Sequence, residues 1–210
     1  MPVAGNLRKM RVEYASPVRY FLRVGEERVP LNERLGQTIS LKFSGSIHCI
    51  ACGRETKRSF NQGHCFPCFR KLASCDRCIV SPELCHFHLG TCREPVWAQE
   101  HCMQPHVVYL ANSSGLKVGI TRAGQIPTRW IDQGATQALP MLKVASRRAS
   151  GLIESVLKAH VADRTDWRKM LKGPPEPVDL VERAEALLPL CQSALSEADP
   201  PELEGQPEFI

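Results

Sequence analysis

Two Cys-x2-Cys pairs constrain the fold of this chain more than any other feature. Cys49 and Cys52 form the first pair, and Cys65 and Cys68 form the second pair after a gap of 12 residues. Two intervening residues let one turn of chain point two thiolates at one ion, and two such turns complete a closed tetrahedral Zn²⁺ site. A closed site has no position for a catalytic water, so we predict a structural zinc.

A second group of possible metal ligands follows along the chain. It comprises Cys75, Cys78, Cys85, His88, Cys92 and Cys102, with His86 and His101 as further options. Cys75 and Cys78 form a third pair that needs two more ligands, either Cys92 with Cys102 or Cys85 with His88. We therefore predict a second structural zinc, whose ligand pairing stays open.

The surroundings of these cysteines favour metal binding over disulfides. No apolar run approaches the roughly 18 residues of a membrane span, and residues 1–14 have no apolar core that could act as a signal peptide. We expect a cytoplasmic protein without a membrane partner, and clustered cysteines in a reducing compartment are more often metal ligands. Residues 49–104 are too short and too rich in turns for an apolar core, so metal would have to substitute for it.

Charge is distributed unevenly along the 210 residues. Residues 1–104 contain 15 Lys/Arg and 9 Asp/Glu, residues 105–172 contain 11 and 4, and residues 173–210 contain 1 and 9. A basic body of this kind favours a polyanion, so we predict that the chain binds nucleic acid, either DNA or RNA. The acidic end is a candidate contact for a protein partner.

Composition divides the chain into five segments. They are a β-rich segment at 1–48, the Cys/His block at 49–104, an α+β domain at 105–172, a helical segment at 173–198 and an acidic, disordered tail at 199–210. We predict an α+β fold with a β-rich, zinc-ribbon N-terminal half, then a three-stranded sheet with flanking helices, then a helical C-terminal segment. In the first segment, alternation predicts strands at 18–24 and 38–43, with a turn at 25–28.

The sequence of the α+β domain predicts the order of its strands and helices. "HVVYLA" (106–111), "LKVGIT" (116–121) and "ALPMLKVAS" (138–146) predict three strands. "IPTRWIDQGA" (126–135) predicts a helix that starts at Pro127 and ends near Gly134. Apolar residues at helical spacing in 149–164 predict a second helix. The residues after 177 are also helical in pattern, and Pro189 either kinks this helix or divides it in two.

This order resembles that of the GIY-YIG nuclease superfamily. "VVY" (107–109) stands where the first triplet is expected, and "KVG" (117–119) stands where the second is expected. A branch of the superfamily writes the second triplet with Lys. "IESVLK" (153–158) resembles the glutamate helix of that superfamily. The resemblance implies a three-stranded sheet that carries a metal-dependent endonuclease site.

The resemblance also implies a role for each candidate site residue. Glu154 would hold one Mg²⁺ at the scissile phosphate. Arg129 would bind the non-bridging oxygens, and Tyr109 would orient or deprotonate the water. Gly119 would allow a close approach on a crowded strand. Lys117 stands where a tyrosine is expected; it can hold phosphate as a point charge, but it serves as a base only if its pKa is depressed.

Two other functions compete with an endonuclease. One is a non-catalytic nucleic-acid-binding module with a degenerate nuclease site, and the other is a zinc-organised protein-interaction adaptor. The whole chain is also similar to an uncharacterised bacterial family, through "CHFHLGTCREP" (85–95), "HCMQPHVVYLANSSGLKVGITR" (101–122), "IPTRWIDQGA" and "WRKML" (167–171). This second resemblance implies a shared fold and no particular activity.

Overall fold

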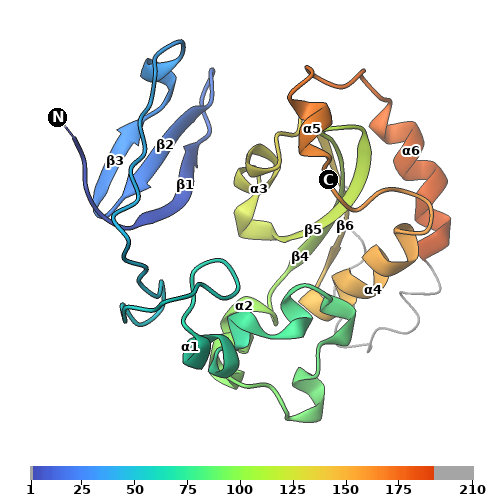
Figure 1. The fold of residues 1–210 in the computed structure, drawn as a ribbon. Coiled ribbons are helices and arrows are strands. Elements are labelled where there is room, and N and C mark those ends of the chain that lie inside the picture. Colours follow the sequence, from blue (N-terminus) through green and yellow to red (C-terminus); the bar gives the residue numbers. More distant parts are fainter. Residues whose placement is uncertain (1, 192–210) are drawn as a thin grey trace. The chain divides into compact units, whose positions relative to one another are not determined.

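The structure is a computed structural model that describes residues 2–191. The predicted tail at 199–210 and the end of the predicted helical segment at 173–198 lie outside the described residues. The chain forms two compact units, Met1–Cys75 and Asp76–Ile210 (Figure 1). Each unit contains one three-stranded antiparallel sheet, and both contain helices, so the mixed α and β class of the prediction is confirmed.

The elements have the following bounds. The strands are β1 (Leu7–Glu13), β2 (Arg19–Val24), β3 (Glu27–Pro30), β4 (His106–Asn112), β5 (Leu116–Arg122) and β6 (Gln137–Val144). The α-helices are α1 (Phe66–Lys71), α2 (Pro95–His101), α3 (Thr128–Asp132), α4 (Arg147–Leu157), α5 (Trp167–Met170) and α6 (Leu180–Leu187). Short 3₁₀ helices are η1 (Asn32–Arg34), η2 (Ala73–Cys75), η3 (Arg77–Ile79), η4 (Pro82–Leu84), η5 (Phe87–Leu89), η6 (Ala123–Gln125) and η7 (Leu188–Cys191).

The first unit contains a meander of β1, β2 and β3 in that order. The predicted strand at 18–24 is confirmed as β2, and the chain reverses into β3 through Gly25, whose φ of 59° suits glycine. The predicted strand at 38–43 is wrong, because these residues are irregular. Ile39, Leu41 and Phe43 are exposed, and their alternation forms no strand because no strand within residues 2–191 pairs with them.

The second unit is built on a sheet in the order β5-β4-β6. Every residue of the central strand β4 is buried. Val107, Tyr109 and Ala111 face one side and pack against residues around α3, including Trp130. The alternate residues face the other side and pack against α4 and α6, so helices cover both faces (Figure 1). This double cover explains why β4 reads as a nearly continuous apolar run.

The element order predicted for 106–172 is confirmed at the level of strands and helices. The three predicted strands are β4, β5 and β6, and the two predicted helices are α3 and α4. Gly134 follows α3 with a φ of 63°, as a C-terminal glycine does. The backbone N–H of Val118 also donates to the carbonyl of Ala162, so the chain that leaves α4 lies along the outer edge of β5.

None of the helices within residues 2–191 has the length and apolar character needed to cross a membrane.

Candidate functional site

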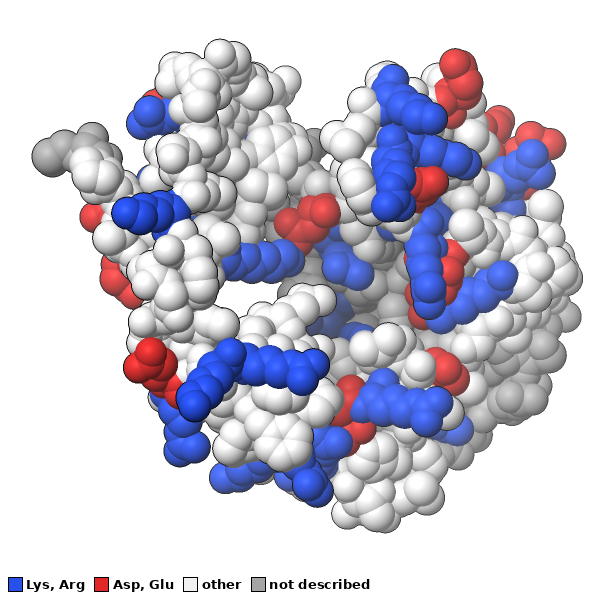
Figure 2. Space-filling model, in the orientation of Figure 1, with Lys and Arg blue, Asp and Glu red and all other residues white. Residues whose placement is uncertain are grey.

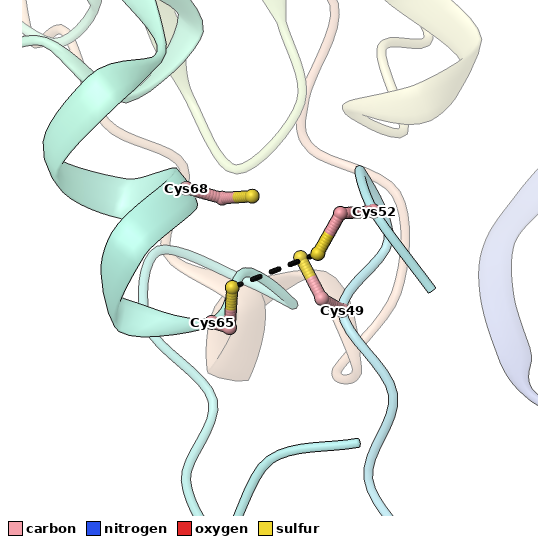
Figure 3. Close-up of side chains that lie close together, drawn as sticks. All are labelled: Cys49, Cys52, Cys65 and Cys68. Carbon is pink, nitrogen blue, oxygen red and sulfur yellow. Dashed lines mark hydrogen bonds between the residues drawn. The ribbon is translucent and has the colours of Figure 1, made fainter. Parts of the chain in front are cut away.

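The first metal centre is formed by Cys49, Cys52, Cys65 and Cys68, whose sulfur atoms all lie within 4.8 Å of one another. Figure 3 shows the four side chains pointing toward a common centre. The Sγ atoms of Cys52 and Cys65 are 3.8 Å apart. Zn–S bonds of about 2.3 Å place two ligands of a tetrahedral ion about 3.8 Å apart. The cluster is therefore compatible with a structural zinc.

Local backbone structure brings these thiols together. Cys49 and Cys52 lie on a tight turn closed by the N–H of Gly53, which donates to the carbonyl of Cys49. Cys65 caps the N-terminus of α1, and Cys68 lies in its first turn. The two Cys-x2-Cys pairs are thus a tight turn and a helix start, each of which turns the chain sharply enough to aim two sulfurs in one direction.

The electrostatics of the four thiols also favour a cation. Burial raises the pKa of Cys49, but backbone N–H groups of Cys65, Cys52 and Ala51 bond to its sulfur and bring the pKa down to about 6. Sulfur hydrogen bonds with Cys52 and Cys65 raise the pKa of Cys68 to about 12. The thiols share protons when no metal is bound, and a metal ion would replace those protons.

The remaining predicted ligands lie in several short elements. Cys75 ends η2, Cys78 lies in η3, Cys85 follows η4, His88 lies in η5, Cys92 lies before α2 and Cys102 follows α2. Burial, followed by the charges of Cys85 and Asp76, raises the pKa of the Cys78 thiol to about 11. Among the described residues, the second cluster of metal-binding groups is Asp76, Cys78 and His86. The pairing expected from the sequence stays a prediction.

Tyr109 and Gly119 face each other across β4 and β5. A Cβ atom built on Gly119 would lie 2.7 Å from the Tyr109 hydroxyl oxygen and 2.8 Å from Cζ. Real Cβ atoms do not approach other atoms so closely, so the tyrosine ring occupies the space that a side chain at 119 would need. The glycine therefore permits the position of the phenol.

The Tyr109 phenol is held from the side of α3. Its hydroxyl donates to Oε1 of Gln133 at 2.8 Å, and the ring meets Trp130 edge to face with 6.0 Å between centroids. Burial raises the pKa of Tyr109, and the charge of Arg129 together with a hydrogen bond to it opposes that shift. Tyr109 is thus a protonated, fixed phenol with a guanidinium beside it.

Lys117 is a buried cation on the same face of the sheet as Tyr109. It pairs with Ala111 in register, its side chain is 3% exposed, and its Nζ donates to the Thr165 hydroxyl at 2.7 Å. Burial and the nearby charge of Arg129 lower its pKa to about 8, although Asp163 and Glu154 act in the opposite direction. A substantial fraction of this amine is neutral near pH 8.

Glu154 lies in α4 and is 9% exposed. Burial raises the pKa of its carboxyl, whereas Lys158 lowers it. The Lys158 Nζ lies 3.4 Å from Glu154 Oε2 and 3.7 Å from Asp163 Oδ2. A cation therefore already lies between two carboxylates at this position.

These residues interact as one electrostatic group. Tyr109, Lys117 and Gly119 share one face of β4 and β5, and the charges of Arg129 and Glu154 act on both Tyr109 and Lys117. Gln133, Asp163 and Thr165 also interact with this group, and none of them is a candidate from the sequence alone. The last two lie in the irregular chain after α4, where local pattern carries no signal for a contact with β5.

Comparison with known proteins gives a family and no activity. A family model described as "Protein of unknown function (DUF2797)" matches residues 36–208. No curated protein and no solved structure matches the chain. The predicted resemblance to an uncharacterised family is confirmed.

Proposed function

This chain belongs to the DUF2797 family of proteins of unknown function, and from the chemistry of its own side chains we propose that it hydrolyses phosphodiester bonds in nucleic acid. The observation that carries this proposal is the grouping of a fixed phenol, an amine with a lowered pKa, a guanidinium and a carboxylate around β4 and β5. Phosphodiester hydrolysis needs a positioned water, a base, and positive charge to stabilise the transition state.

The order of the strands and helices that carry these residues supports the resemblance to GIY-YIG nucleases. The resemblance implies two triplets on paired strands, then an arginine helix, then a glutamate helix. Here the last residues of the two triplets, Tyr109 and Gly119, lie directly opposite each other on β4 and β5. Arg129 lies in α3 and Glu154 lies in α4. The close contact between Tyr109 and Gly119 gives a physical reason for a glycine at the end of "KVG".

Lys117 is the base in this proposal. Its neutral Nζ takes a proton from the attacking water, the water oxygen bonds to phosphorus, and the bond from phosphorus to the leaving sugar oxygen breaks. The leaving oxygen takes a proton from solvent. The lowered pKa of Lys117, about 8, makes an amine suitable for this step near neutral pH. A lysine can therefore replace the tyrosine expected at this position.

The other residues bind and orient the phosphate. The Arg129 guanidinium, which is exposed, binds non-bridging oxygens. The Tyr109 hydroxyl, fixed by Gln133, positions the water. Glu154, with Asp163 nearby, is the residue that would hold a Mg²⁺ ion, which when bound supplies Lewis-acid stabilisation of the phosphate. Hard carboxylate oxygens suit Mg²⁺, and Lys158 already marks the position as favourable for a cation.

Basic residues near this group support a nucleic-acid substrate. Figure 2 shows Lys and Arg side chains gathered around α5, where Arg168 and Lys169 are exposed. This helix follows directly after Thr165, the hydrogen-bond partner of Lys117. The phosphate backbone of a nucleic-acid strand bound at Lys117 would thus continue along α5. The four-cysteine zinc in the other unit has no open position and serves stability in this proposal.

Cleavage of DNA and RNA in Mg²⁺ or Mn²⁺ by the full chain tests the proposal. Glu154→Gln and Arg129→Gln should each lower the rate at least about 100-fold, which corresponds to nearly 3 kcal/mol of transition-state stabilisation. Glu185→Gln and Arg183→Gln, which change exposed residues of α6, are the matched controls and should cut normally.

Two experimental results would indicate a different function for the chain. Binding with a steep salt dependence but no cleavage, with or without metal, would indicate a non-catalytic nucleic-acid-binding module. No binding at low salt, even after removal of the acidic residues beyond 191, would favour a zinc-organised adaptor that binds protein. Cleavage that persists in both Glu154→Gln and Arg129→Gln would refute the roles assigned to these two residues.

A further inference from the structure

We propose a second metal site in the Asp76–Ile210 unit, formed by the Asp76 carboxylate, the Cys78 thiolate and the His86 imidazole. Each of these residues offers one ligand atom, and the three atoms lie within 4.8 Å of one another. The set differs from both pairings that the sequence suggests, because Asp76 belongs to neither of them. The cation it fits is a borderline divalent ion, with zinc as the leading candidate.

Hydrogen bonding around His86 fixes which nitrogen is available. The Thr91 hydroxyl donates its proton to the carbonyl of His86 at 3.3 Å. Nδ1 of His86 lies 2.7 Å from the same hydroxyl oxygen, so this ring nitrogen already has a hydrogen-bond partner. Nε2 is therefore the ring nitrogen that remains for a metal ion. This is the arrangement in which a partner at one ring nitrogen presents the other to a metal.

The available nitrogen points at a carboxylate. Nε2 of His86 lies 3.6 Å from Oδ2 of Asp76, which is too long for a hydrogen bond. A cation between these two atoms would be attracted by both of them. Bonds of about 2.0–2.2 Å to zinc place nitrogen and oxygen ligands about 3.3–3.5 Å apart, close to the observed distance. The pair is spaced as two ligands of one ion.

The surroundings orient the carboxylate and leave room for solvent. Nε of Arg93 lies 2.6 Å from Oδ2 of Asp76, so the carboxylate is held in place while its second oxygen and remaining lone pairs stay available. All three ligand residues are half-buried. We therefore assign the fourth position to a water molecule, unlike the closed four-cysteine centre.

The proposed ion would act on the nearby helix α4. The segment between Cys78 and His86 includes η4, and Pro82 and Glu83 of this 3₁₀ helix lie against Gly151 of α4. Arg147 at the start of α4 donates from Nη2 to the carbonyl of Ile79 at 2.7 Å. An ion that closes the loop from 76 to 86 would hold this contact and, one turn further on, the backbone at Glu154.

Metal content of the full chain, purified without chelator, gives the first test. The wild type should contain two zinc ions per chain. Cys52→Ser should leave one, His86→Ala and Asp76→Asn should each leave one, and the combination of Cys52→Ser with His86→Ala should leave none. Cys191→Ser and His160→Ala change residues outside both clusters and should leave two. This readout is independent of any cleavage activity.

X-ray absorption at the zinc edge gives a second test, which counts the sulfur ligands. The proposal predicts five sulfur ligands shared between two ions, four from the first cluster and one from Cys78. Eight sulfurs, with the second zinc lost from Cys85→Ser, Cys92→Ser or Cys102→Ser and retained in His86→Ala, would overturn this ligand set. One zinc per chain in the wild type would also overturn it.

Discussion

Replacing Lys117 with methionine should stabilise the protein at neutral pH and abolish its proposed activity. The pKa of Lys117 falls from an ordinary value of 10.5 to about 8, chiefly because its amine is buried. Holding the charged form in the fold at pH 7 therefore costs about 3 kcal/mol. Methionine has a similar length and no charge, but it loses the hydrogen bond to Thr165, worth about 1 kcal/mol. The expected net gain is about 2 kcal/mol.

The pH dependence of this gain has a definite direction. Below pH 8 both the folded and the unfolded chain hold the lysine proton, so the full penalty applies to the wild type. Between pH 8 and 10.5 only the unfolded chain holds it, so the stability of the wild type rises with pH relative to the variant. Above pH 10.5 the Lys117 amine is neutral in both the folded and the unfolded chain. The advantage of Lys117→Met should then disappear, and the lost hydrogen bond should make the variant slightly less stable.

Denaturant unfolding followed by tryptophan fluorescence measures this difference. All three tryptophans, Trp97, Trp130 and Trp167, belong to the Asp76–Ile210 unit, so the signal reports the unit that contains Lys117. Subtracting the free energy of unfolding of the variant from that of the wild type at each pH removes the contribution of the ionisable groups that both proteins share. A variant that is less stable at pH 7, or a difference that stays constant from pH 7 to 10.5, would refute the reasoning.

Three further predictions concern close packing and metal. Gly119→Ala should destabilise the chain by about 1–3 kcal/mol and reduce cleavage, because its Cβ would displace the Tyr109 phenol; denaturant curves and cleavage rates check this. Gly151→Ala should destabilise by a similar amount in the same assay, because its Cβ would lie 2.5 Å from Cβ of Pro82. Gly124→Ala, where no atom lies within 4 Å, is the control for both. Loss of the four-cysteine ion through Cys52→Ser should remove hydrogen-exchange protection from α1 and preserve it in β4; equal loss in both would contradict two separate units.

Local patterns in the sequence predicted much of the second unit. Short apolar segments separated by turn residues identified β4 and β5, and the glycine after α3 marked its end. Alternation identified β2 but failed at residues 38–43, for which the described part of the chain provides no partner strand. A strand forms only where a neighbour completes its hydrogen bonds, and that neighbour is not part of the local sequence.

The sequence alone determined the four-cysteine cluster and the order of the candidate site residues, because both follow from spacing along a covalent chain. Only the tertiary structure decided that Lys117 is buried with a lowered pKa and that Gln133 and Thr165 contact the site. It also placed Asp76 beside Cys78 and His86. The pKa of a side chain depends on burial and on neighbouring charges. Both are set by loops that return from distant parts of the chain, and spacing does not encode where those loops go.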